Sequence, residues 1–173
     1  MKRYAGLFAL LAGWQALAQT GWEAGVAKAV ITPREPVWMA GFGSRNRPSE
    51  GVRQDIYARA LALKDTSGKT SVILTLDLVA VDRRMADEVA ARCLARFGVP
   101  WDRLLLNVSH THSGPVAGLD PMPMYELNEV QRQVIRRYTA DLIDKTAGVV
   151  GAAIQGLAPA ELFFEQGLAG IAV

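Results

Sequence analysis

The chain has 173 residues, of which 50% are hydrophobic and 21% are charged, a balance typical of one globular domain. This composition excludes wholesale disorder and collagen-like or coiled-coil architectures. The formal net charge is +2, from 19 basic and 17 acidic residues. Lys2 and Arg3 account for the whole excess, so the remaining chain offers no electrostatic basis for binding nucleic acid.

Residues 1–18 have the three parts of a secretory signal peptide. Lys2-Arg3 precede an uncharged apolar run over 4–14, and Ala16-Leu17-Ala18 supplies a small-x-small cleavage site. The run is shorter than the roughly 20 apolar residues that span a bilayer; a membrane anchor or an N-terminal core helix is the alternative. We predict cleavage after Ala18, which separates a signal peptide (1–18) from a mature part (19–173) exported to the periplasm or secreted.

The first half of the mature part indicates strands separated by a long loop and a turn. The expected elements are strands over 24–31, 56–64 and 71–80, a loop over 36–51, and a turn over 65–69 with Gly68 in a left-handed conformation. The continuous apolar run in the third strand is typical of a strand buried on both faces.

A helix is expected to begin at Arg83, capped by Asp82, and to end at Gly98. A second buried strand follows over Leu104–Val108, so strand, helix and strand with short connections indicate a parallel βαβ unit. The helix carries an apolar stripe made of Met85, Val89, Cys93, Leu94 and Phe97. The single cysteine is therefore interpreted as a buried hydrophobe, not a nucleophile.

A second, long helix is expected from a cap at Asn128 to about Gln155. Its buried side is predicted to comprise Val130, Ile135, Tyr138, Leu142, Val149 and Ala153. The tail suggests two strands, over 160–166 and 168–173, about Gly167. The predicted fold class is α/β, a mixed sheet with a parallel βαβ unit and flanking helices. Because the last strand stops without a polar end, we expect an incomplete, truncated domain.

The two histidines of the chain, His110 and His112, follow directly on the strand that ends at Val108. The carboxyl ends of parallel strands are where α/β proteins bind ligands. If the chain stays extended, residues two apart point the same way, so both imidazoles face one cavity that can hold a divalent metal. The alternative is a pair of loop histidines that form local hydrogen bonds. A catalytic zinc normally has three protein ligands, so this pair is an incomplete set.

The segment His110–Pro115, His-Thr-His-Ser-Gly-Pro, resembles the signature of the neutral/alkaline non-lysosomal ceramidases. Four further segments resemble the family in the same order, and together with the signature they cover nearly all of the mature part. These segments are 24–33, 39–45, 55–61 and 77–78.

This resemblance implies a Zn²⁺-dependent amide hydrolase that cleaves the N-acyl bond of ceramide into sphingosine and a fatty acid. It assigns His110 as a zinc ligand and His112 as a catalytic residue in substrate handling or proton transfer. The implied partner is ceramide or another N-acyl lipid, met at a membrane surface. The remaining zinc ligands of the family, a histidine, a glutamate and a tyrosine, lie further along a longer chain, so we expect weak or no activity from this chain alone.

Other functions stay open at this point. One alternative is a non-catalytic exported module with a vestigial HxH metal site. A serine hydrolase using Ser109 or Ser113 is disfavoured, because neither serine lies in a G-x-S-x-G elbow. Asp77, at the end of a neighbouring strand, is a candidate for orienting an imidazole, or else a turn carboxylate.

Overall fold

The computed structural model describes residues 21–118, 125–163, 165–168 and 170. Over these residues the chain forms one mixed sheet of five strands in the order β4-β3-β2-β1-β5, with two α-helices. The elements are β1 (Trp22–Val30), β2 (Tyr57–Lys64), β3 (Thr70–Leu76), α1 (Arg83–Phe97), a 3-10 helix η1 (Trp101–Arg103), β4 (Leu104–Val108), α2 (Glu129–Gln155) and β5 (Ala158–Ala160). The α/β class is confirmed. The predicted signal peptide lies outside the described residues.

The three central strands form an antiparallel meander that begins with the first predicted strand. β1 pairs with β2, and β2 pairs with β3 through the expected turn. In that turn Gly68 has a φ of 81°, and the Asp65 carboxylate accepts hydrogen bonds from Ser67 and Lys69. These hydrogen bonds, led by that from the Ser67 hydroxyl, lower the pKa of the Asp65 carboxyl.

The predicted βαβ unit is confirmed, because β4 pairs with β3 in parallel after the chain has passed through α1. Local signals fix the ends of α1. The Asp82 side chain accepts a hydrogen bond from the Met85 backbone N–H, and Gly98 ends the helix with a φ of 68°. Cys93 is fully buried on the inner side of α1, and burial raises the pKa of its thiol to about 11.

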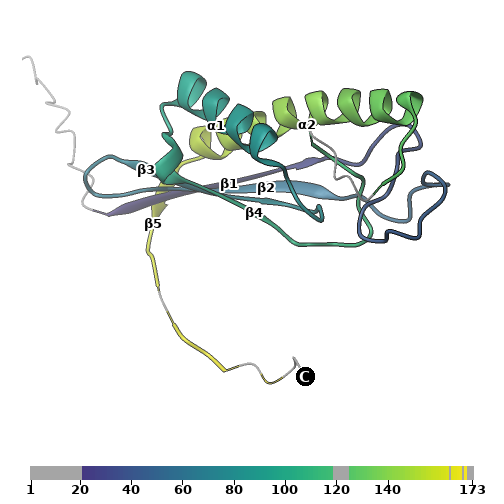
Figure 1. The fold of residues 1–173 in the computed structure, drawn as a ribbon. Helices are drawn as coiled ribbons and strands as arrows, with labels where there is room; N and C mark the ends of the chain where they lie inside the picture. Colours follow the sequence, from purple (N-terminus) through teal and green to yellow (C-terminus); the bar gives the residue numbers. More distant parts are fainter. Residues whose placement is uncertain (1–20, 119–124, 164, 169, 171–173) are drawn as a thin grey trace, which may run out of the picture.

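Both helices lie on the same face of the sheet, as Figure 1 shows. The longer helix, α2, begins with a capping box in which Asn128 and Gln131 exchange side-chain-to-backbone hydrogen bonds. It packs on β1, β2 and α1, and the Tyr138 hydroxyl, buried in this layer, donates to the Ile31 carbonyl at 2.8 Å. Among the described helices, none is both long and apolar enough to cross a membrane.

Within the described residues the sheet is covered on one face only, which corrects the expectation of strands buried on both faces. Ile73 of β3 is 38% exposed and Leu105 of β4 is 60% exposed, whereas their neighbours along each strand point into the core. Two helix residues expected to be buried are exposed as well: Leu94 on the outer side of α1, and Val130 in the first turn of α2. An apolar run shows that a strand or helix packs, but not how many of its sides are covered.

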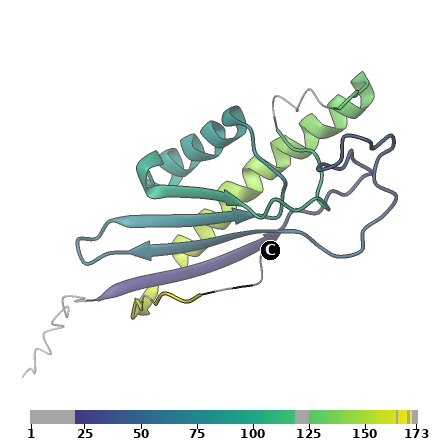
Figure 2. The same ribbon diagram turned by 60° about the horizontal axis from the view of Figure 1, so that its bottom comes forward.

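The predicted pair of tail strands is wrong for the described residues. β5 has three residues, which pair with the first three residues of β1, and the described part of 161–170 contains no strand. The chain instead leaves the edge of the sheet with Leu162, Phe163 and Leu168 exposed (Figure 2). A strand requires a neighbour for its backbone hydrogen bonds, and β5 has its neighbour in β1 only over Ala158–Ala160.

Substitution of Gly25 tests how closely the backbones of β1 and α2 approach each other. A Cβ atom at this position would collide with the Ala153 carbonyl oxygen of α2, so the backbones would have to separate. We expect Gly25→Ala to lower the free energy of unfolding by about 1–3 kcal/mol, as overpacking does in other cores. Urea denaturation measures this change. Gly43→Ala is the matched control, because a Cβ there meets nothing within 4 Å. Equal stability of the two variants would contradict the close approach.

Candidate functional site

The histidine segment lies at the carboxyl ends of β3 and β4 and is held there by two neighbours. On one side, the Ser109 backbone N–H donates to the Leu76 carbonyl of β3 at 3.0 Å. On the other, the loop segment 39–45, which contains Gly41 and Gly43 and is called the glycine-rich loop below, runs antiparallel to the end of the histidine segment. The Ala40 N–H donates to the Gly114 carbonyl at 2.9 Å, and a β-bridge links residues 39 and 115. Three parts of the chain that are distant in sequence therefore meet at the site.

His110 does not continue the strand. Its φ of 55° places it in the left-handed region, where the chain turns, so the expected extended conformation is wrong at this residue. Its Nδ1 lies 2.8 Å from the Val79 carbonyl oxygen. Because that oxygen can only accept a hydrogen bond, Nδ1 is the donor, and in the neutral imidazole the lone pair then lies on Nε2. This is the tautomer that metal binding through Nε2 requires.

The two imidazoles lie together in spite of the turn. Their ring centroids are 5.1 Å apart with an interplanar angle of 65°, and both residues are exposed. The ring of Phe42 lies edge-on to His112, with centroids 5.2 Å apart. The structure therefore brings the two histidines predicted from sequence to one open place, bordered by an aromatic side chain.

Gly41 and Tyr125 were not among the residues predicted from sequence. Gly41 has a φ of 103°, and a Cβ there would lie 2.5 Å from Cγ of His112, so only glycine lets the loop pass beneath this ring. The Gly41 N–H donates to the hydroxyl of buried Tyr125 at 2.9 Å. Tyr125 thus fixes the loop on which His112 rests. The glycine-rich composition of 39–45 pointed to this loop, whereas no local pattern links it to Tyr125.

The Asp77 carboxylate binds residues of β2 and not the histidines. It accepts a hydrogen bond from the Tyr57 N–H at 2.9 Å and forms an ion pair with Arg59 at 3.0 Å. The described residues also contain no cluster of three or more His, Cys, Asp or Glu side chains. Within this part of the chain, His110 and His112 are thus a partial donor set for a metal.

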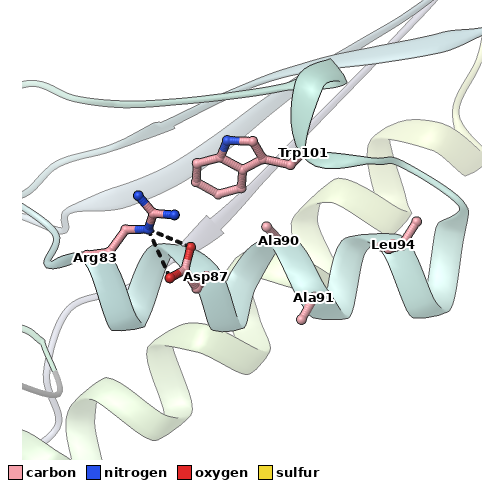
Figure 3. Close-up of a pocket in the computed structure, with 6 residues that line it drawn as sticks. All are labelled: Arg83, Asp87, Ala90, Ala91, Leu94 and Trp101. Atoms are coloured by element: carbon pink, nitrogen blue, oxygen red, sulfur yellow. Dashed lines mark hydrogen bonds and ion pairs between the residues drawn. The ribbon is translucent and has the colours of Figure 1, made fainter.

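A shallow depression of about 220 Å³ lies away from the histidines, between α1 and η1 (Figure 3). Arg83 forms an ion pair with Asp87 at its rim and lies 5.8 Å from the ring of Trp101. Its lining comprises Arg83, Asp87, Ala90, Ala91, Leu94 and Trp101. It contains neither of the predicted site residues.

Comparison with known proteins places this α/β fold and its histidine segment in one family of hydrolases. Residues 22–170 match the family described as "Neutral/alkaline non-lysosomal ceramidase, N-terminal". The chain belongs to this family, and the resemblance drawn from the sequence is confirmed.

Individual relatives agree with this assignment. The chain is 24% identical over 149 residues to the neutral ceramidase of Drosophila pseudoobscura pseudoobscura, and 23% identical over 143 residues to that of Drosophila melanogaster. These matches cover 78% and 74% of this chain but 21% and 20% of the relatives. The chain thus spans about one fifth of the length of the curated relatives that it matches.

Two solved structures share the fold. The neutral ceramidase from Pseudomonas aeruginosa matches with a TM-score of 0.68 and 24% identity, over 81% of this chain and 22% of that one. A ceramidase complexed with C2 matches with a TM-score of 0.66 and 22% identity, with the same coverage. The mixed sheet with its helices is therefore an architecture that occurs in ceramidases.

Substitution of Gly41 tests whether the glycine-rich loop supports the ring of His112. We expect Gly41→Ala to displace the His112 ring and to lower the free energy of unfolding by about 1–3 kcal/mol, because the substitution combines a left-handed φ with a collision. NMR resonances of the two imidazoles measure the displacement, and urea denaturation measures the stability. Gly43→Ala is again the control. Unshifted His112 ring signals in Gly41→Ala would show that the loop does not support the ring.

Proposed function

We propose that this chain is the amino-terminal part of an exported, Zn²⁺-dependent amide hydrolase that cleaves the N-acyl bond of ceramide or a related N-acyl lipid. Three findings support the proposal: membership of the neutral/alkaline ceramidase family, relatives named neutral ceramidase, and a related ceramidase solved with C2. The observation that carries it is the hydrogen bond from His110 Nδ1 to the Val79 carbonyl, which leaves Nε2 free beside His112.

The proposed chemistry divides between the two imidazoles. Zn²⁺, when bound, would activate water and polarise the amide carbonyl. Neutral His110 supplies one ligand through Nε2, and the Val79 carbonyl holds its ring in the correct tautomer. His112 is exposed beside it and carries a proton to the leaving amine, the role of a general acid. Phe42, which is 52% exposed at this edge, offers an apolar contact to a lipid substrate.

We further propose that the site is incomplete in this chain alone. A catalytic zinc normally has three protein ligands, and the described residues bring together only the two histidines. The chain covers 22% of the solved ceramidase chains, so the missing ligands are proposed to come from the part of the family domain that this chain does not span. Weak activity or none follows for the isolated chain.

A second candidate function is a non-catalytic exported module in which the HxH pair is vestigial. The observation in its favour is the exposure of both histidines without a third metal-binding side chain in the described residues. The two candidates differ in what His110 does, because a vestigial pair makes no measurable contribution to zinc binding.

Zinc binding tests the role of His110. We expect the purified chain to bind Zn²⁺ in isothermal titration calorimetry and His110→Ala to weaken this binding at least about tenfold, the effect of removing a ligand or its support. Ser113→Ala is the control, because its exposed side chain lies in the same turn. Unchanged affinity in His110→Ala would remove His110 as a ligand and favour the vestigial module.

Hydrolysis of a fluorescent ceramide tests whether the site is complete. We expect little or no turnover by the chain alone at saturating Zn²⁺, because two imidazoles do not complete a catalytic zinc site. Product formation is followed by chromatography, with His112→Ala as the background control. Tight stoichiometric zinc together with turnover that His112→Ala abolishes would refute the incomplete site.

A further inference from the structure

The long helix α2 contains two fully buried threonines, whose hydroxyls bond to different parts of the chain. The Thr146 hydroxyl donates to the Leu142 carbonyl one turn earlier in the same helix, which is a common way for a helical threonine to satisfy its side chain. The Thr139 hydroxyl instead bonds outside the helix, to the backbone of Gly118. Thr139 is therefore the one of the two that joins α2 to another segment.

Gly118 lies at the end of the segment that carries the histidines. Its N–H donates to the Thr139 hydroxyl at 3.0 Å, and its carbonyl accepts from the same hydroxyl at 3.3 Å. Its φ is 134°, and a Cβ there would collide with the Asp82 carboxylate at the start of α1. Both helices thus border this residue, and only glycine fits between them without strain.

The chain between the histidines and Gly118 is held by further contacts. The Val116 N–H donates to the Trp38 carbonyl at 2.7 Å. Val116 also packs in a buried cluster with Ile135, which lies one helical turn before Thr139 on the same side of α2. The turn with the two histidines therefore lies between two fixed points, the end of β4 and the contact with Thr139.

We propose that Thr139 is a positioning residue for the histidine pair. Its hydroxyl serves both the N–H and the carbonyl of Gly118 in a buried place, so it acts as a neighbouring peptide group would. This contact fixes where the histidine segment ends, and with it where the turn places His110 and His112. The inference deepens the proposed function and rests on it, because this placement matters for chemistry only if the two imidazoles act there.

Histidine NMR of the zinc-free 173-residue chain at a fixed pH tests the proposal, because the chain contains only two histidines. We expect Thr139→Val, which keeps the shape of the side chain and removes the hydroxyl, to shift or split the ring signals of both histidines. Exchange of the Gly118 amide should become at least about tenfold faster, since its acceptor is lost.

Two further variants control this experiment. Thr146→Val removes an equally buried hydroxyl from the same helix, and it should leave the ring signals and the Gly118 exchange rate unchanged. Thr139→Ser keeps the hydroxyl, and it should retain the parent ring signals.

Unmoved ring signals in Thr139→Val would overturn the proposal, because the contact with Gly118 would then serve stability alone. Equal shifts in Thr146→Val, or displaced ring signals in Thr139→Ser, would overturn it as well. If Thr139→Val does not fold, the Gly118 amide of the unaltered chain decides: protection from exchange supports the proposal, and exchange as fast as that of an exposed amide refutes it. None of these readouts involves zinc, so the positioning role can fail while zinc binding through His110 stands, and the reverse.

Discussion

The structure depends on the close packing of α2 against small residues of the central strands. Gly25 of β1 and the alanines at 58, 60 and 62 of β2 give the sheet a smooth inner face. Because these side chains are short, the backbone of α2 at Ala153 lies directly on β1. The long helix packs on β1 and β2, and α1 lies beside it on the same face of the sheet. The ends of β3 and β4, which carry the histidine segment, are placed by this packing.

The same packing makes the sheet one-sided. Both helices lie on the inner face of the sheet (Figure 1). Successive side chains along each strand therefore alternate between this covered face and the uncovered one. The inner set is almost entirely apolar and mostly buried, as in any two-layer α/β unit. The outer set includes exposed apolar residues, Val26, Ile73 and Leu105, and exposed charged residues, Lys28 and Arg59. One-sided packing accounts for the buried inner face, whereas the apolar residues on the outer face depart from the polar surface that such a sheet normally presents.

The elements that the sequence predicts well are those whose signals are local. Asp82 and Gly98 define the ends of α1, and Asn128 begins α2, because caps act within a few residues of a helix end. The number of covered faces is not a local property, and this is why Ile73 and Leu105 are exposed within runs that indicated full burial. The end of β5 depends on the short stretch where β1 can pair with it, which no pattern in the tail reveals.

In the candidate site, too, the features with local signals could be predicted and the long-range contacts could not. The pairing of His110 with His112 could be predicted from spacing and from their place after a strand, although the extended geometry assumed for them is replaced by a turn. The support of His112 could not be predicted, because Gly41 and Tyr125 are 84 residues apart in the chain and meet only through the fold. The role of the Val79 carbonyl likewise depends on how the chain passes from β3 to α1.

The left-handed backbone of His110 has a consequence for how this protein would change over generations. Most residues with a Cβ are disfavoured at a φ of 55°; glycine adopts this conformation without strain, and asparagine does so more readily than most. An imidazole there lowers the stability of the loop in exchange for a ring placed beside its neighbour. If a descendant of this protein no longer required His110 for catalysis, we would expect glycine or asparagine to replace it early. The buried positions beneath the helices would vary only later.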